Sequence, residues 1–330
     1  MAEWLVEEGM AEHRAILVER SHIVAARVDW LGFVRPGTVA DAWLFSRPRG
    51  GRRGVARLVN GTEVLVDGLT PDMTEGTTVR LCLTRASIAE RGRNKLALAR
   101  PAPAGTPERD GPSLAEALRA TGRAVRTCHP RDGRFDDLGW PELVEEALSG
   151  AIAFAGGSLV ISPTPAMTVI DIDGSQPPQA LALAAVPAIA QAIRRLDIGG
   201  NIGIDFPTLA ARADRQRVDA ALDSALAGWS GERTAMNGFG FVQLVARLER
   251  PSIIALCQRN PARAAANTLE RMALAATGSG PLALHANPAL RSGLSPGFTA
   301  ALRQATGRDV TWAWNPDIAL QSPFVQTASP

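Results

Sequence analysis

Three aspartates lie in two short apolar segments where the chain could carry out metal chemistry. The segment TVIDIDGS (residues 168–175) contains Asp171 and Asp173, and GGNIGIDFPTL (residues 199–209) contains Asp205. Because successive side chains of a strand point to opposite faces, Asp171 and Asp173 are expected on one face of the same strand. Ligands of open α/β sheets gather at the carboxyl ends of strands. Asp171 and Asp205 are therefore candidate ligands for one divalent cation.

The chemistry of such a pair would be that of a hard metal ion. Mg²⁺ uses one or two carboxylates and keeps several waters. The ion could polarise a phosphodiester and lower the pKa of an attacking water. An Asp at a strand end is also a common turn or helix-cap residue. Strand geometry alone leaves both interpretations open.

A strand–helix–strand unit must position these aspartates. Alternating apolar residues predict strands over Thr168–Asp173 and Asn201–Phe206, with helical periodicity over Gln179–Arg195 between them. A crossover of this length places the two strands parallel in one sheet. Pro187 is expected to kink the crossover helix or split it in two. A further long helix is predicted over Arg215–Leu226.

The chain before this unit has the pattern of a small β-barrel. Short strand segments are separated by Gly and Pro, namely Arg14–Val18, Ile23–Val28, Gly54–Val59, Glu63–Val66, Thr78–Thr84 and Lys95–Leu98. We expect residues 1–28 to form an opening hairpin that packs on the core, and residues 29–100 to form the barrel. Residues 101–113 are predicted to be a linker, and residues 114–330 an α/β core with a frayed C-terminal tail.

Basic and aromatic residues of the predicted barrel could contact nucleic acid. Five arginines surround a GRRG turn: Arg47, Arg49, Arg52, Arg53 and Arg57. They could contact phosphates, or they could form a solvated hairpin tip. Four aromatic side chains, Trp30, Phe33, Trp43 and Phe45, could stack on bases. Filling of the barrel core is the commoner use of such residues, so we favour that interpretation for them.

Overall composition limits the classes of function. The formal net charge is +2, so any nucleic-acid surface must come from local clustering of charge. Three widely spaced cysteines argue against a disulfide framework and are typical of a reducing compartment. No Cys or His cluster has zinc-ligand spacing, so no structural zinc is expected. The chain shows neither a signal-peptide pattern nor a long apolar run, which predicts a cytoplasmic protein without a membrane partner.

Three segments resemble the catalytic core of the ribonuclease E/G family, in the right order and with similar spacing. They are GGSLVISPTPAMTVIDIDGS (156–175), AIAQAIRRLDIGGNIGIDFPTL (188–209) and FGFVQLVARLERPSI (239–253). More weakly, AEHRAILVERSHIVAARV (11–28) is similar to the opening hairpin of the family. The segment EGTTVRLCLTRASIAERGRNKLALARP (75–101) is similar to the end of its inserted RNA-binding barrel.

The resemblance implies an α+β fold in which an OB-like barrel is inserted near the start of an RNase H-like/DNase I-like α/β core. It also implies an endoribonuclease that cuts single-stranded RNA with Mg²⁺ held by Asp171 and Asp205, with Mn²⁺ as the alternative ion. Asp173 stands where the family usually has an Asn that helps hold the scissile phosphate. This third carboxylate could join the catalytic group and strengthen metal binding, or it could repel the phosphate. The candidate RNA-binding residues are Arg49, Arg52, Arg53, Lys95, Arg247 and Arg250.

The chain also departs from the family pattern. Thr208 replaces a second family Asp, and residues 284–293 lack the cysteines of the family's intersubunit zinc link. The segment 101–139 is too short for the family's full 5′-monophosphate sensor. We therefore expect no zinc-linked tetramer, while a homodimer is compatible with the sequence. Two alternatives remain: an inactive RNA-binding protein that kept the fold, and an unrelated α/β enzyme such as a metal-dependent phosphatase.

Overall fold

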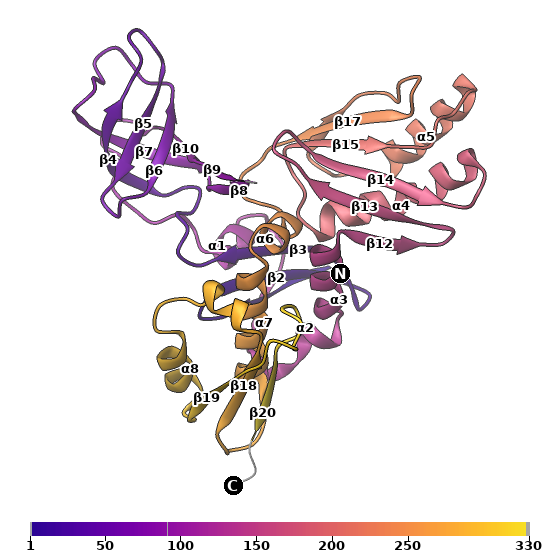
Figure 1. Cartoon of the computed structure of the whole chain (residues 1–330). Helices are drawn as coiled ribbons and strands as arrows, with labels where there is room; N and C mark the ends of the chain where they lie inside the picture. The colour runs from indigo at the N-terminus through magenta and orange to yellow at the C-terminus, as the bar shows by residue number, and fades with distance from the viewer. Residues whose placement is uncertain (1, 91, 328–330) are drawn as a thin grey trace.

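A computed structural model describes residues 2–90 and 92–327 and shows a mixed α+β protein. In Figure 1 a β-barrel occupies the upper left, a six-stranded sheet with helices the upper right, and a smaller C-terminal sheet the bottom. A four-stranded sheet built largely from the N-terminal strands lies between these parts. None of the helices in the described residues is long and apolar enough to cross a membrane.

The expected barrel is present and closed. Its strands, in the order around the barrel, are β10 (Ala97–Pro101), β6 (Glu63–Asp67), β5 (Arg53–Leu58), β4 (Val39–Ser46) and β7 (Thr78–Arg85). Small and branched side chains such as Leu44, Val64 and Leu81 fill the interior. A hairpin of β8 (Ile88–Glu90) and β9 (Arg93–Lys95) lies between β7 and β10 in sequence. The predicted linker follows the barrel wall, because Arg109 and Val39 exchange two backbone hydrogen bonds.

The N-terminal segment is more than the expected hairpin. The strands β1 (Glu3–Glu8), β2 (Glu12–Glu19) and β3 (His22–Trp30) form an antiparallel meander, and β11 (Val125–Cys128) joins β1 in parallel. The boundary at residue 28 was therefore placed too early. The apolar residues of β1 are buried, and helix α1 (Leu114–Arg119) packs on one face of this sheet.

The six-stranded sheet carries the predicted strand–helix–strand unit. Its strand order is β12 (Ala151–Phe154), β13 (Gly157–Pro163), β14 (Thr168–Gly174), β15 (Asn201–Asp205), β17 (Phe241–Ala246) and β16 (Gly231–Arg233). As predicted, β14 and β15 are parallel, and helix α4 (Pro178–Arg195) connects them. The second predicted helix is present as α5 (Arg212–Ala225). The neighbouring pairs β13–β14 and β15–β17 are antiparallel.

The prediction that Pro187 could split the crossover helix is wrong, since α4 is assigned as one helix of 18 residues. Pro187 removes the backbone donor that would bond the carbonyl of Leu183. The helix is nevertheless stabilised by its buried face, where Leu181, Ala185 and Ile189 belong to the largest hydrophobic cluster of the described chain. Tertiary packing therefore outweighs the local cost of one proline.

The C-terminal part follows the sheet without a long break. Its helices are α6 (Ile253–Arg259), α7 (Pro261–Ala275) and α8 (Phe298–Thr306), and its strands are β18 (Leu282–Ala286), β19 (Val310–Trp314) and β20 (Phe324–Thr327). The expected frayed tail is wrong as far as Thr327, because β20 pairs with β18. Residues 328–330 lie outside the described residues. Helix α3 (Trp140–Ser149) and the short α2 (Arg134–Asp137) connect β11 to the six-stranded sheet.

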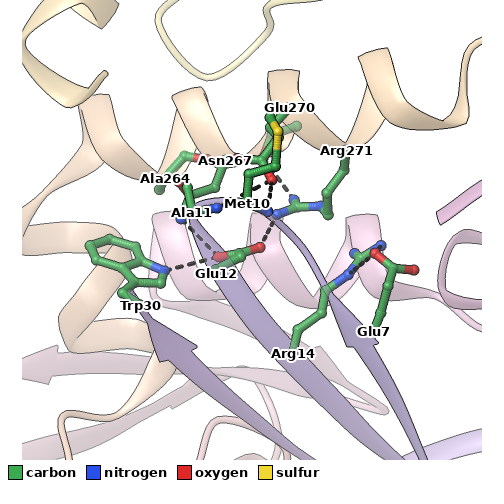
Figure 2. A network of polar contacts seen from close by, with 11 residues as sticks. Glu7, Met10, Ala11, Glu12, Arg14, Trp30, Ala264, Asn267, Glu270 and Arg271 are labelled. Carbon is green, nitrogen blue, oxygen red and sulfur yellow. Dashed lines mark hydrogen bonds and ion pairs between the residues drawn. The ribbon is translucent and has the colours of Figure 1, made fainter. Parts of the chain in front are cut away.

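A buried polar network joins α7 to the N-terminal sheet (Figure 2). One carboxylate oxygen of Glu12 accepts hydrogen bonds from the indole of Trp30 at 2.9 Å and the amide of Asn267 at 2.8 Å. The other oxygen pairs with the Arg271 guanidinium. Beside it, one Glu270 oxygen accepts from backbone amides including that of Ala11 at 3.3 Å. Residues more than 250 positions apart in sequence are thereby fixed together.

A second buried ion pair lies next to this network. The Arg14 guanidinium donates to Glu7 at 2.6 and 2.8 Å, and both side chains are about 4% exposed. Burial, followed by the charge of the nearby Arg271, lowers the pKa of Arg14 to about 10. Aromatic rings of Phe135 and Trp140 lie under the guanidinium, at 4.5 and 4.9 Å from its central carbon. Such cation–π contacts partly replace the lost hydration.

Glu270 makes the stability of the protein depend on pH. Burial, with a smaller contribution from the Glu12 charge, raises its pKa from 4.5 to about 7. The folded state therefore holds a proton that the unfolded state has lost, and stability should fall as pH rises from about 4.5 through 7, by roughly 3 kcal/mol. Glu270→Gln keeps an oxygen acceptor but cannot ionise. We expect urea denaturation at pH 5 to 8 to show a flatter pH dependence for this variant.

The control for this experiment is Glu145→Gln, which changes an exposed carboxylate on α3. It should follow the pH dependence of the wild-type protein. A Glu270→Gln variant with the full wild-type dependence would show that another group carries the proton.

Candidate metal and RNA site

The parallel register of β14 and β15 brings two of the predicted aspartates opposite each other. Asp171 pairs with Asp205 across the two strands. Neighbouring strands lie about 4.8 Å apart, and residues in register point to the same face. Both side chains are exposed, whereas Ile170, Ile172 and Ile204 are buried on the helix-covered face. The structure therefore brings Asp171 and Asp205 together on the open face of the sheet, where two carboxylates fit one hydrated divalent ion.

A row of four residues crosses the open face at this position. In order from β13 to β17 it consists of Val160, Asp171, Asp205 and Phe241. Val160 is 39% exposed. The two carboxylates thus lie in the middle of the sheet, with an apolar side chain on each side. This leaves the pair open to an extended ligand that crosses the strands.

Asp173 lies on the same face, one position further toward the end of β14, and pairs with Ser158 of β13. In the described residues, no three His, Cys, Asp or Glu side chains come close enough to hold a metal ion together. The geometry therefore gives no support to Asp173 as a third direct ligand. One Asp171 oxygen accepts a hydrogen bond from the amide of Ile172 at 2.9 Å. Among the described residues, no arginine or lysine forms an ion pair with Asp171 or Asp205.

A glycine in β15 shapes the floor beside the carboxylates. A Cβ atom at Gly203 would lie 2.6 Å from the ring of Phe241 and 2.9 Å from the sulfur of Met167. These contacts are closer than atoms can approach without moving. The Phe241 ring therefore lies directly over the glycine, next to the Asp205 position of the same strand. Glycine therefore leaves room for these two side chains to pack against the strand backbone.

The turn before β17 holds an aromatic residue in solvent beside this floor. Phe239 is 82% exposed. The Asn237 side chain accepts from the backbone amides of Phe239 at 2.9 Å and Phe241 at 3.1 Å. The backbone oxygen of Gly240 accepts from Phe206, the residue after Asp205, at 3.2 Å. The sequence reasoning missed Phe239, although the NGFG pattern is a turn signal that could have found it.

The backbone conformation of the turn requires glycine at position 240. Gly240 has φ of +92°, and a Cβ there would lie 2.4 Å from the Phe206 oxygen. From the other side, both Asp219 carboxylate oxygens accept from the Met236 amide, at 3.1 and 3.2 Å. Asp219 is itself paired with Arg233 at 2.8 Å. The turn is therefore anchored to β15 at one end and to α5 at the other.

The arginine loop of the barrel divides into structural and open side chains. Arg47 donates to the carbonyl oxygens of Gly51 at 2.9 Å and Thr70 at 2.8 Å, so it holds the loop together. Arg53 is 73% exposed but pairs with Asp67 at 3.3 Å. Arg49 and Arg52 are exposed and line a surface hollow of about 640 Å³. These two are the best placed of the predicted barrel arginines to contact phosphates.

The remaining predicted RNA contacts lie away from the carboxylates. Arg247 and Arg250 follow β17, which runs antiparallel to β15, so they lie past the edge of the sheet opposite Asp205. The Arg247 side chain is 75% exposed, whereas Arg250 is 23% exposed and pairs with Glu249 at 3.2 Å. Lys95 is 42% exposed in β9 and lies 4.0 Å from Glu90. The structure therefore does not gather all six residues around one phosphate.

The favoured interpretation of the barrel aromatics as core residues is wrong. Trp30 is buried, but in the N-terminal sheet. Trp43 is 50% exposed on β4, and its ring lies 6.2 Å from that of Phe45. The guanidinium of Arg57 lies 4.8 Å over the Phe45 ring. These side chains therefore form part of the outer surface of the barrel, since smaller residues fill its interior.

The fold and the site define a protein with a closed barrel and an open-faced sheet that carries paired carboxylates. Residues 113–246 match the model of the ribonuclease E/G family, a segment that includes Asp171, Asp173 and Asp205. Over this segment the chain is similar to the ribonuclease E/G family. No curated protein matches the chain.

The different positions of the three aspartates predict different roles in ion binding. Asp171→Asn and Asp205→Asn each remove one of the two facing carboxylates. Each should weaken Mn²⁺ binding by at least the roughly 10- to 100-fold typical of losing a metal-site partner. Asp173→Asn should have a much smaller effect. Paramagnetic titration of Mn²⁺ into the three variants measures this, and an equal loss in all three would make Asp173 a direct ligand.

Proposed function

We propose that the protein is a metal-dependent endoribonuclease that cleaves single-stranded RNA by attack of water on the phosphodiester. One observation carries the proposal. Asp171 and Asp205 face each other on adjacent parallel strands, within the segment that matches the ribonuclease family. Mg²⁺ is the proposed ion, with Mn²⁺ as the alternative, because carboxylates and waters suit both.

In this reaction the side chains of the protein would position the ion and supply the negative charge that binds it. A divalent ion at the pair would lower the pKa of a water and polarise the phosphodiester. Asp171 and Asp205 would hold that ion on the open face of the sheet. Their fixed register keeps the two oxygen donors in place before substrate arrives. The neighbouring side chains, Val160 and Phe241, are apolar, so they do not compete with the ion for the two carboxylates.

We propose that the barrel is an OB-like module that contributes RNA affinity. Five-stranded barrels of this type bind oligonucleotides. Trp43 and Phe45 offer ring surfaces on the barrel, and Arg57 lies over the Phe45 ring while pairing with Glu63 at 2.8 Å. Arg49 and Arg52 add positive charge in the arginine loop of the same barrel. Stacking and phosphate contacts of this kind bind single strands with little sequence preference. Three free cysteines fit the cytoplasm as the compartment, and the protein would act as a monomer or homodimer without zinc.

The alternative function is RNA binding without catalysis. The exposed carboxylate of Asp173, where the family usually has Asn, favours this alternative. A third negative charge beside the pair would repel the phosphate that the reaction requires. An RNA-binding protein of this kind would need the barrel surface but not the ion. Cleavage assays distinguish the two functions.

We expect the purified protein to cut a fluorescent single-stranded RNA in the presence of Mg²⁺ and to lose this activity with a chelator. Asp205→Asn should lower the rate by roughly a hundredfold or more, as for loss of a group that stabilises developing charge. Denaturing electrophoresis of the products measures the rate.

Asp317→Asn is the matched control, because it changes an exposed carboxylate in the C-terminal part. It should cleave like the wild-type protein. Tight RNA binding without any metal-dependent cleavage would establish the alternative function. Equal activity of Asp205→Asn and Asp317→Asn would exclude the proposed site.

Barrel arginines should set the salt dependence of RNA binding. Each phosphate contact on a single strand contributes about 0.7 to the slope of log affinity against log salt. Arg49→Gln with Arg52→Gln should therefore lower the slope by about 1.4. Adding Arg53→Gln should change it less, because Arg53 already pairs with Asp67. Fluorescence anisotropy at several salt concentrations measures the slopes.

Arg119→Gln with Arg131→Gln serves as the control pair, since both arginines are exposed outside the barrel. The control pair should retain the wild-type slope. If both double variants gave the wild-type slope, the arginine loop would be solvated surface only.

A further inference from the structure

We propose that Phe239 is a stacking residue for an unpaired nucleobase next to the phosphate that the ion at Asp171 and Asp205 would bind. The inference rests on the proposed function and adds to it a binding subsite for one base. Phe239 is 82% exposed in the turn before β17, and this turn is hydrogen-bonded to Phe206, the residue after β15.

The first step of the argument is proximity. Phe241 pairs in register with Asp205, and Phe239 lies two residues before Phe241. The amide of Phe206, directly after Asp205, donates to Gly240 at 3.2 Å. The hydroxyl of Thr208 donates to the Phe239 carbonyl at 3.5 Å. The backbone of Phe239 is therefore tied to the chain that follows the carboxylate.

The second step is preorganisation. Asn237 fixes the amides on both sides of Gly240, and Gly240 has a conformation that strongly favours glycine. The base of the turn is held by Asp219 through the Met236 amide. A ligand that contacts the Phe239 ring would therefore not have to order the loop. Binding to a rigid element keeps more of the interaction energy.

The third step is chemistry. The Phe241 ring already packs against Gly203, so the surface beside Asp205 is apolar. Every nucleobase has a planar π face that stacks on such a ring without regard to sequence. The ring also carries no charge, so it can approach the carboxylates without competing for their cation. An unpaired base of single-stranded RNA fits these requirements, whereas a base within a duplex would have to unstack first.

The test measures RNA binding in the presence of Mg²⁺, with oligoribonucleotides whose backbone linkages are non-hydrolysable analogues, so that the ion is in place and no cleavage occurs. Phe239→Ala should weaken binding of a single-stranded oligoribonucleotide by roughly 5- to 150-fold, the range for loss of one stacked base. Phe239→Leu keeps the apolar bulk and should show most of this loss, whereas Phe239→Trp should restore binding. Met272→Ala is the control, because Met272 is 43% exposed on α7. It should bind like the wild-type protein.

A second measurement identifies the stacked base itself. Oligonucleotides with an abasic site at successive positions should include one position that weakens wild-type binding by a similar factor. At that position, the abasic site should cause no further loss in Phe239→Ala. The thermal unfolding midpoint of Phe239→Ala should match that of the wild-type protein, because the side chain is exposed.

The outcomes separate this inference from the proposed function. Equal RNA affinity of wild-type protein and Phe239→Ala would overturn the stacking role and leave the nuclease proposal intact. If Phe239→Ala and the abasic site each weakened RNA binding without adding to each other, and no metal-dependent cleavage occurred, the stacking role would be supported and the nuclease proposal overturned. Wild-type protein that binds no RNA would overturn both. A Phe239→Ala variant with unchanged RNA affinity but a smaller mass in solution would assign the ring to contact between two copies of the chain.

Discussion

The parallel, in-register pairing of β14 with β15 is the constraint on which the candidate site depends. Helix α4 crosses over between the two strands and places their carboxyl ends at the same edge of the sheet. If β15 ran in the opposite direction, its final residue would lie at the far edge, roughly 13 Å away for a strand of this length. Asp171 and Asp205 could not then share an ion. The crossover through α4 thus determines that Asp171 and Asp205 lie next to each other on the open face.

Successive side chains of each strand alternate between the two faces of this sheet, so one face forms the core and the other carries the aspartates. Ile170, Ile172 and Ile204 are buried beneath the sheet, and burial of each contributes about 1.5–3 kcal/mol to stability. A shift of one residue in register would bury the aspartates and expose the isoleucines. The hydrophobic core therefore fixes the facing carboxylates without any direct bond between them. Stability and the candidate reaction depend on the same register.

Local patterns in the sequence were sufficient to predict β14, α4 and β15, and from them the facing pair Asp171 and Asp205. They were not sufficient to place Trp43 and Phe45, because a period of two identifies two faces but not which one is buried. The ion pair between Glu12 and Arg271 joins residues 259 positions apart, and no local pattern contains this information. Packing of the complete chain decides all such contacts.

Electrostatics explains why a neutral ring, rather than an arginine, would lie beside the carboxylates. Two negative charges about 5 Å apart repel a phosphate chain unless a cation lies between them. An arginine at the position of Phe239 could pair with Asp205 and displace that cation. The exposed arginines Arg49 and Arg52 lie instead on the separate barrel, where they can attract RNA without this competition. One RNA strand would then be bound in three ways. The barrel would supply affinity, Phe239 a neutral contact, and the aspartates the ion.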